Sequence, residues 1–436
     1  MLVRLGFHAR HRLAGWRHQL RRHTTPAGRL LLAGLVGAAL LGVDTRQNLA
    51  HQLFTLLLAV AVLALAGLRM RRPGLQLLRE LPRYLTEGDT LSYPVQLRNT
   101  GAHVLRGASL GENWPDPRPD EQAFLRAKRA GEGADARWLR LCRQTMRAQG
   151  DPASVPALAP GARLNITLQL HALRRGRLQL PGLQVKQAER LGLFCRQFAQ
   201  PLAASLLVLP RRYRLPPLTL PGQRAREQER SALGDSLAEA EEFQSLRDYR
   251  PGDPLRLIHW KSWARSGKPV IREYQEETSV RHALVLDTFC PPQAEEVLEE
   301  AVRLAASFAC SVDTRESLLD LLFAGQQVYR ETMGRGHGSE LQLLEVLAGV
   351  QACDALPFRL LQDAVLAHRH DLSGVICILI AWDDARAAFI RTLAALGVAH
   401  QAWLVVPAGS QPARPDWQAL GVRLLEAGKL PEGLGA

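Results

Sequence analysis

The sequence lacks the motifs with which common enzyme classes hold phosphates, metals or redox groups. It contains neither a G-x-x-x-x-G-K-[ST] loop nor a G-x-G-x-x-G turn, so it has no recognisable nucleotide-binding site. None of its six cysteines forms a C-x-x-C pair, which argues against a zinc site and against a disulfide framework. Unpaired cysteines in apolar stretches are typical of a reducing compartment. We therefore expect no cofactor.

Acidic residues are too few to balance the arginines. The chain has 436 residues, of which 47% are hydrophobic and 22% charged, and this is enough for two or three folded domains. Its net charge of +13 favours attraction to anionic lipid beside a membrane. Nucleic-acid binding is an alternative source of such a charge, but no nucleic-acid-binding motif accompanies it. Either kind of binding by the soluble part would need one continuous basic face there.

Two uncharged apolar runs lie near the N-terminus. They are LLLAGLVGAALLGV over Leu30–Val43 and LFTLLLAVAVLALAGL over Leu53–Leu68, and both are apolar on all faces. The first is shorter than the roughly 20 residues that span a bilayer, unless the Arg29 side chain reaches back to the interface. The alternatives are a signal peptide, which the second run argues against, and two buried helices of a soluble protein. We predict a transmembrane helical hairpin that meets the lipid bilayer through residues 28–68.

The distribution of arginine predicts the orientation of this hairpin. Arginines are frequent on both flanks of the pair, whereas the connecting loop has only Asp44 and Arg46. By the positive-inside rule both termini are cytoplasmic, and residues 1–72 form an N-terminal arm and a two-helix anchor. We expect a multi-pass protein of a bacterial inner membrane that functions through the residues after this anchor. The flanking arginines are Arg10, Arg12, Arg17, Arg21, Arg22, Arg29, Arg69, Arg71 and Arg72.

Residues 73–210 have the alternating pattern of β-strands. Leu91–Gly101 alternates apolar and polar residues and ends in a turn signal, and Leu164–Leu173 alternates in the same way. Arg174–Val185 follows directly, which predicts that it pairs with the preceding strand as a hairpin. The charged stretch at about 120–149 favours helix. We predict a small antiparallel β-sandwich with a helical insertion at about 120–149.

The last part of the chain, residues 282–436, alternates strands and helices. Apolar runs at His282–Thr288, Val375–Trp382 and His400–Pro407 are typical of buried strands, and the stretches between them have helical periodicity. Strands separated by helices of ten or more residues predict a doubly wound, mostly parallel sheet. The predicted fold class is therefore α/β plus β.

The segment between these two parts, residues 211–281, has the most distinctive sequence. Its first half is rich in Pro, Arg, Glu and Gln and is expected to be an exposed linker. Further on, Phe243, Leu246 and Tyr249 are spaced by three, which predicts one helical turn. Ile258 and Trp260 are expected to face a core.

The stretch LRDYRPGDPLRLIHWKSWARSGKPVIREYQEE resembles the signature of domain-of-unknown-function family 58. That signature has the form Y-x-x-G-D-x-x-R-x-I-x-W-x-x-x-A-R. Its positions in this chain are Tyr249, Gly252, Asp253, Arg256, Ile258, Trp260, Ala264 and Arg265. The predicted hairpin, the β-rich part and the α/β part also fit the layout of that family, so the resemblance extends over nearly the whole chain.

The resemblance implies that residues 282–436 form a von Willebrand factor A-like domain, preceded by a linker and signature segment at 211–281. It also implies a membrane-tethered protein that accompanies a MoxR-type AAA+ ATPase and often a transglutaminase-like membrane protein. The expected role is that of an adaptor or scaffold in the assembly or maturation of a membrane-side complex.

A domain of the A type can bind Mg²⁺ through an Asp-x-Ser-x-Ser motif after its first strand and a later Asp. In this chain Asp287 is present, but Phe289 and Pro291 replace both serines. Asp383 follows a later strand and could take the place of the second carboxylate. Two carboxylates without the hydroxyls make a poor cage for a hard cation. We therefore expect no metal, and we expect both carboxylates to cap helices or to accept bonds from loop amides.

The signature segment has two compatible interpretations. Its residues either hold the linker against the α/β domain or form a polar surface that docks a partner. The residues concerned are Tyr249, Gly252, Asp253, Arg256, His259, Trp260, Lys261 and Arg265. The alternative function is a membrane-associated hydrolase of unrecognised type, with His259 as a general base oriented by Asp253. Because no Ser or Cys nucleophile adjoins His259 in a recognisable elbow, we do not predict an enzyme.

Overall fold

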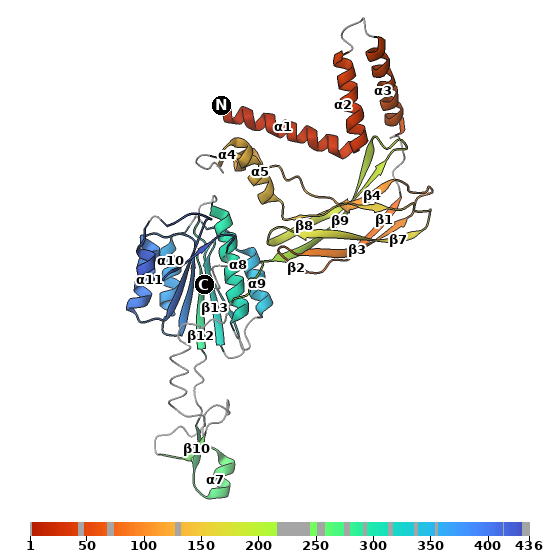
Figure 1. Ribbon diagram of the computed structural model, residues 1–436. Helices are drawn as coiled ribbons and strands as arrows, with labels where there is room; N and C mark the ends of the chain where they lie inside the picture. The colour runs from red at the N-terminus through yellow and green to blue at the C-terminus, as the bar shows by residue number, and fades with distance from the viewer. Residues whose placement is uncertain are drawn as a thin grey trace. The chain divides into compact units, whose positions relative to one another are not determined.

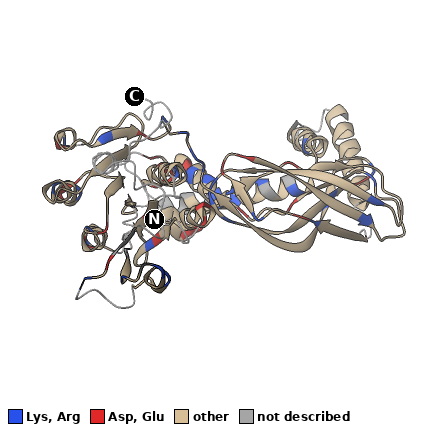
Figure 2. Ribbon diagram, turned by 90° about the horizontal axis from the view of Figure 1, so that it is seen from below, with Lys and Arg blue, Asp and Glu red and all other residues tan. Residues whose placement is uncertain are grey.

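The computed structural model divides into two compact units, Met1–Arg211 and Arg212–Ala436 (Figure 1). Charged residues lie mostly on helices and loops, and the strands of both units are largely uncharged (Figure 2). The structure describes residues 2–41, 48–67, 74–126, 132–215, 245–250, 258–273, 280–290, 294–312, 317–334, 339–353, 356–412 and 414–429.

Three helices begin the first unit. They are α1 (Leu2–His23), α2 (Pro26–Leu41) and α3 (Asn48–Gly67). α2 and α3 lie side by side (Figure 1). Within α3, Leu49–Gly67 is long and apolar enough to cross a membrane and is only 11% buried, whereas the apolar part of α2, Pro26–Leu40, is shorter. The described residues therefore contain one candidate membrane span.

α1 packs against two further helices, α4 (Glu121–Arg126) and α5 (Ala134–Thr145), which lie inside the predicted helical insertion. The ring of Phe7 lies 5.2 Å from that of Phe124 and 5.8 Å from that of Trp138, measured between centroids. Phe7 and Phe124 are buried in this small aromatic core. No element is predicted from the sequence for α1, because its many arginines and histidines obscure the apolar stripe.

Two sheets make up most of the first unit. The first has the order β1–β3–β7–β5 and the second the order β2–β9–β8–β4–β6. The described pairings are antiparallel except that of β2 with β9, which is parallel. The strands are β1 (Leu75–Arg79), β2 (Tyr84–Thr86), β3 (Thr90–Asn99), β4 (Ala108–Glu112), β5 (Ala148–Gln149), β6 (Ala153–Val155), β7 (Arg163–Ala172), β8 (Gly176–Ala188) and β9 (Cys195–Leu209).

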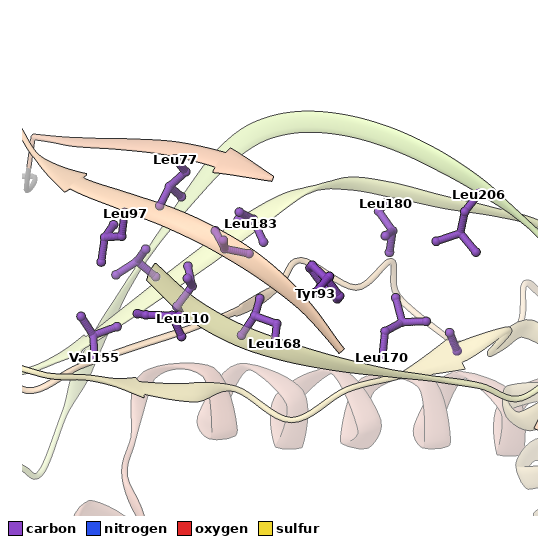
Figure 3. Close-up of a cluster of buried hydrophobic side chains, with 14 of the residues drawn as sticks. Leu77, Tyr93, Leu97, Leu110, Val155, Leu168, Leu170, Leu180, Leu183 and Leu206 are labelled. Atoms are coloured by element: carbon purple, nitrogen blue, oxygen red, sulfur yellow. The ribbon is translucent and has the colours of Figure 1, made fainter. Parts of the chain in front are cut away.

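The two sheets share one hydrophobic core (Figure 3). Leu97 and Leu168 reach it from the first sheet, and Leu110 and Leu183 reach it from the second. β7 exposes and buries alternate residues over much of its length, which is the pattern that predicts this strand from the sequence.

The predicted hairpin between β7 and β8 is wrong. β7 pairs with β3 and β5 in one sheet, whereas β8 pairs with β9 and β4 in the other. The chain passes from one sheet to the other before Gly176, whose φ of 110° suits a residue without a side chain. Alternation fixes which face of a strand is buried, but it does not identify the neighbouring strand.

A six-stranded sheet forms the centre of the second unit. Its order is β14–β13–β12–β15–β16–β17, and its strands are parallel apart from β14. α8 and α9 lie on one face of the sheet, and α10 and α11 lie on the other (Figure 1). The mostly parallel sheet predicted for residues 282–436 is thus present, although β14, α12 and β17 are not predicted from the sequence. The strands are β12 (Val280–Leu286), β13 (Ser317–Ala324), β14 (Val328–Met333), β15 (Gly374–Leu379), β16 (His400–Val406) and β17 (Arg423–Glu426), and the helices are α8 (Glu295–Ser311), α9 (Glu340–Gly349), α10 (Phe358–Ala367), α11 (Asp384–Ala395) and α12 (Asp416–Ala419).

The signature segment contains a small substructure of its own. β10 (Ser245–Asp248) pairs antiparallel with β11 (Val270–Glu273), and α7 (Trp260–Ser266) lies between them in the sequence. The helical turn predicted from Leu246 and Tyr249 is wrong, because Leu246 belongs to β10. Pairing with β11, more than twenty residues further on, overrides the local spacing, and a four-residue window does not reveal such a partner.

Candidate functional site

The carboxyl ends of β12 and β15 bring together the residues considered as a degenerate metal site. Because these strands are parallel neighbours, the residues that follow them meet at one edge of the sheet. Asp287 follows β12 and is fully buried. Its carboxylate accepts hydrogen bonds from the backbone amides of Phe289, at 3.0 Å, and Ile380, at 3.2 Å. The carboxylate therefore ties the β12 loop to the β15 loop.

Arg386, in the first turns of α11, is the main partner of Asp287. Its Nε lies 2.6 Å from Asp287 Oδ2 and its Nη2 lies 3.0 Å from Oδ1, which is a bidentate ion pair. Nη2 also donates to the Phe289 carbonyl at 3.1 Å, and Nη1 pairs with Asp383. The guanidinium lies 4.8 Å from the centroid of the Phe358 ring. Arg386 is 4% exposed and Asp287 is fully buried, so the pair that they form is withdrawn from water, whereas the Asp383 side chain is 51% exposed.

Asp383 is the N-cap of α11. Its Oδ1 accepts a hydrogen bond from the Arg386 backbone amide at 2.9 Å, which satisfies one of the free amides at the start of the helix. The same carboxylate contacts the Arg386 guanidinium through Oδ2. One arginine thus forms ion pairs with both carboxylates that the sequence suggests as ligands.

These residues do not fit a Mg²⁺ site. The oxygens of Asp287 and Asp383 face a guanidinium and backbone amides, and the hydroxyl of Thr288 donates to the Ala324 carbonyl at 2.6 Å. Among the described residues, no group of three or more His, Cys, Asp or Glu side chains could hold a metal ion. In this site a side chain, that of Arg386, supplies the positive charge.

Burial governs the protonation of these groups. It raises the pKa of the Asp287 carboxyl, and the contacts with Arg386 and the two amides oppose that rise. Burial also lowers the pKa of the Arg386 guanidinium, but the charges of Asp287 and Asp383 outweigh it, so that the pKa is raised overall and the cation persists. Burial raises the pKa of the neighbouring Cys290 thiol to about 11, so this cysteine is not a thiolate nucleophile at neutral pH.

The second candidate site is the described part of the signature segment. His259 is the N-cap of α7, and its backbone amide donates to the Val270 carbonyl at 2.8 Å. Ile258 is buried and bridges to Ile271. Gly267 ends α7 with a φ of 70°, a conformation that favours glycine at this position. The backbone thus fixes α7 against β11.

Trp260 is exposed, so the prediction that it faces a core is wrong. Its side chain is 64% exposed and stacks on Trp263, with ring centroids 5.3 Å apart and an angle of 21° between the planes. Ile258 is buried as predicted. In a strand, Ile258 and Trp260 would lie on the same face, two residues apart. The chain becomes helical after His259, so the Trp260 side chain points in another direction. Lys261 and Arg265 are also exposed, four residues apart on α7.

Part of the signature falls outside the described residues. Gly252, Asp253 and Arg256 lie in the segment 251–257, so the proposed orientation of His259 by Asp253 stays untested. The structure does place the Nδ1 atom of His259 2.6 Å from Ser262 Oγ. The backbone amide of Tyr249, the first signature residue, donates to the Pro269 carbonyl at 2.9 Å.

Comparison with known proteins gives one informative match. Residues 245–357 match the family model described as "Protein of unknown function DUF58", which confirms the resemblance of the signature segment over that span. No curated protein matches the chain. A cryo-EM structure of native alpha-2-macroglobulin from E. coli has a TM-score of 0.19 and 12% identity, over 40% of this chain and 9% of that one. A Salmonella alpha-2-macroglobulin that reacted with methylamine has a TM-score of 0.17 and 14% identity, over 34% of this chain and 9% of that one.

Proposed function

Residues 245–357 match the DUF58 family model, and on that premise we propose that the chain belongs to this family and is a membrane-anchored adaptor that recruits a partner protein in the cytoplasm. The observation that carries the proposal is the exposed Trp260 of α7, which stacks on Trp263, together with the exposed Lys261 and Arg265 of the same helix. We call these four residues the α7 face.

The α7 face has the composition of a binding surface. An aromatic side chain that is 64% exposed leaves a large apolar area in water, and its burial against a partner is favourable. Tryptophan and arginine are enriched among the residues that dominate protein interfaces. The two cations on the same helix favour a partner with an acidic rim around an apolar groove. The resemblance points to a MoxR-type AAA+ ATPase as that partner, with a transglutaminase-like membrane protein as a further component.

The first unit supplies the anchor in this proposal. We infer that α2 and α3 form the transmembrane hairpin, with both termini in the cytoplasm of a bacterium and the anchor in its inner membrane. In a soluble protein, a core helix as apolar as α3 would be mostly buried, whereas this one is only 11% buried over its apolar window. Exposed leucines on both helices support the same interpretation; they include Leu30, Leu40, Leu49, Leu56 and Leu63.

The remaining architecture is consistent with this role. The two sheets over a shared core support a β-sandwich. The strand order β14–β13–β12–β15–β16–β17, with an antiparallel edge strand, supports a von Willebrand A-like domain. Because Arg386 takes the place of a metal, we expect partner recruitment to be independent of Mg²⁺.

Crosslinked co-purification from membranes tests the proposal. The test variant, Trp260→Ala/Lys261→Ala, removes an exposed apolar side chain and an adjacent cation from α7. The matched control, Leu360→Ala/Arg359→Ala, removes the same two kinds of side chain from α10, where both are exposed. We expect a AAA+ ATPase to be recovered with the wild type and the control, with and without a chelator, and to be lost with the test variant. Equal recovery with both variants would contradict the role of the α7 face.

One observation favours the alternative function, a hydrolase. The His259 Nδ1 to Ser262 Oγ distance of 2.6 Å is short enough for a base to activate a hydroxyl nucleophile. Labelling of the purified protein with a fluorophosphonate probe tests this pair, with Ser262→Ala as the control. Labelling of the wild type that disappears in Ser262→Ala would support the hydrolase, and labelling of neither would exclude a serine nucleophile at this position.

A further inference from the structure

A basic cleft lies in the first unit between α1 and the segment that precedes α4. It has a volume of about 430 Å³, and its lining includes Arg12, Trp16 and Arg22 from α1 and Trp114, Asp116 and Arg118 from the other wall. The lining residues of α1 recur at helical spacing along one face of that helix. The aromatic core around Phe7 adjoins the cleft, because the His11 ring, which also lines the cleft, lies 5.7 Å from that of Phe7. The cleft thus begins where the packing of α1 against α4 and α5 ends.

The charges in the cleft do not cancel. The Nε atom of Arg118 lies 2.9 and 2.7 Å from the two carboxylate oxygens of Asp116, so this pair is neutral overall. No carboxylate among the described residues pairs with Arg12 or Arg22, and α1 itself contains no acidic residue. The cleft therefore carries a net positive charge. Arg12 and Arg22 both line the cleft, and a guanidinium is suited to an oxyanion because it binds through paired N–H donors.

Gly15 lets the second wall of the cleft approach α1. A Cβ atom at this position would lie 2.6 Å from Nη1 of Arg118, which itself donates to the His11 carbonyl at 3.5 Å. A larger residue in place of Gly15 would displace the Arg118 guanidinium. The backbone thus keeps Arg118 over the helix, and Trp114 and Trp16 complete the walls.

Helix α1, which forms one wall of the cleft, directly precedes the apolar helices in the sequence. Hydrogen bonds hold the junction between α1 and α2 in place. Only Thr24 and Thr25 separate α1 from α2. The Thr25 amide donates to the Leu193 carbonyl at 3.0 Å, and the Arg22 carbonyl accepts from Gln197 Nε2 at 2.9 Å. Arg22 is therefore held a few residues from the start of the apolar segment. Trp16 is 67% exposed on α1, and tryptophan is enriched where membrane proteins meet the lipid headgroups.

We propose that this cleft binds the phosphate group of an anionic phospholipid at the surface of the membrane. The proposal rests on the anchoring of α2 and α3 in a bilayer, and it adds a defined lipid site to that anchor. Arg12 and Arg22 bind the phosphate, and the Trp16 ring lies against the headgroup region. The positive charge of α1 would then bind one phosphate group at a specific site, in addition to its general attraction to anionic lipid.

Native mass spectrometry of the full chain in detergent tests the proposal. Short-chain phosphatidylglycerol, phosphatidylcholine and inorganic phosphate are titrated separately. Arg12→Gln and Arg17→Gln remove the same charge from exposed positions of α1, but Arg17 does not line the cleft. We expect the wild type to prefer phosphatidylglycerol. We expect Arg12→Gln to weaken its binding about tenfold and Arg17→Gln less than about twofold, because only Arg12 donates to the phosphate.

Three outcomes would overturn the proposal. Equal losses in both variants would mean diffuse attraction to charge rather than a site. Equal binding of phosphatidylglycerol and phosphatidylcholine would mean that the cleft does not distinguish an anionic headgroup from a zwitterionic one. Inorganic phosphate that binds as tightly as the lipid would make the free ion the ligand. Retention of the chain in membranes after an alkaline wash is measured separately, so that a failure of the anchor is distinguished from a failure of the cleft.

Discussion

Replacing Arg386 with methionine removes the cation beside Asp287 while keeping much of the length of the side chain. Asp287 then stays fully buried, with the amides of Phe289 and Ile380 as its remaining donors. Loss of one partner from a buried ion pair costs about 3–5 kcal/mol, because the other charge is left desolvated and unpaired. With a urea dependence of about 2.5 kcal/mol per molar for a unit of this size, the unfolding midpoint of the second unit should fall by about 1.5 M.

The thiol of Cys377 provides a local measurement of this change. It is fully buried in β15, the strand beside Asp287, so an alkylating reagent reaches it only when the sheet opens. Alkylation of the Cys377 peptide, followed by mass spectrometry across a urea series, gives the midpoint for this unit alone. The matched control is Arg391→Met, also on α11, whose side chain is 54% exposed and pairs with Asp416. We expect the control to shift the midpoint by less than about 0.4 M, because exposed ion pairs contribute about 0–1 kcal/mol.

The pH dependence of the variant tests the electrostatic reasoning separately. Burial raises the pKa of the Asp287 carboxyl, and in the variant no cation opposes that rise. A carboxyl whose pKa is higher in the folded state contributes stability at low pH, and this stability is lost as the pH rises through the folded pKa. The defect of Arg386→Met relative to wild type should therefore shrink as the pH is lowered, and adding Asp287→Asn should recover part of it. A midpoint shift no larger than that of the control, or a defect that grows at low pH, would refute the reasoning.

Two further predictions concern buried groups elsewhere. In the first unit, Glu112→Gln leaves the buried guanidinium of Arg79, whose Nη1 lies 2.7 Å from Glu112 Oε1, without its charged partner. We expect a destabilisation of about 3 kcal/mol in urea-dependent proteolysis of that unit. A loss below about 0.5 kcal/mol would mean that the hydrogen bonds from Arg79 Nη2 to the carbonyls of Leu180 and Leu202 suffice. In the second unit, burial raises the pKa of Cys290 to about 11, so its alkylation in the folded protein should be more than tenfold slower at neutral pH than in the unfolded chain, and should rise with pH. Equal rates for the folded and unfolded chain at neutral pH would contradict this.

The second unit illustrates what periodicity predicts well. Its central strands are almost entirely apolar and the helices between them have ten or more residues, so element type and order follow from the pattern. The same reasoning does not predict β14, because residues Val328–Met333 lie at the edge of the sheet, are mostly half-exposed and show little alternation of buried and exposed positions. In the first unit the strands themselves are predictable, but their partners are not. β7 and β8 satisfy the same alternation in two different sheets.

The candidate sites were predictable to different extents. Asp287 and Asp383 are recognised from their positions after apolar strands, and the structure places both in one cluster. The sequence analysis does not identify Arg386, although a basic residue three positions after an N-cap aspartate, within a helix that is otherwise apolar on that face, is a usable signal. The prediction for Trp260 fails because a single sequence does not show where a strand pattern gives way to a helix. The cleft beside α1 brings together residues about a hundred positions apart, which no local pattern reveals.

The corner between α1 and α2 has a mechanical consequence. The Thr25 backbone amide donates a hydrogen bond to the Leu193 carbonyl, and the side chains of Cys195 and Gln197 donate to the Arg22 carbonyl. These hydrogen bonds hold the corner against β9 and the turn between β8 and β9. Gly28 is packed so closely on the Leu193 carbonyl that a Cβ atom would clash with it. With α2 and α3 embedded in a bilayer as proposed, the sheets of the first unit would keep a fixed orientation relative to α2 and would not rotate freely about a flexible linker. A pull exerted on this unit by the proposed partner would then be transmitted to the helices in the bilayer as tilt or torque.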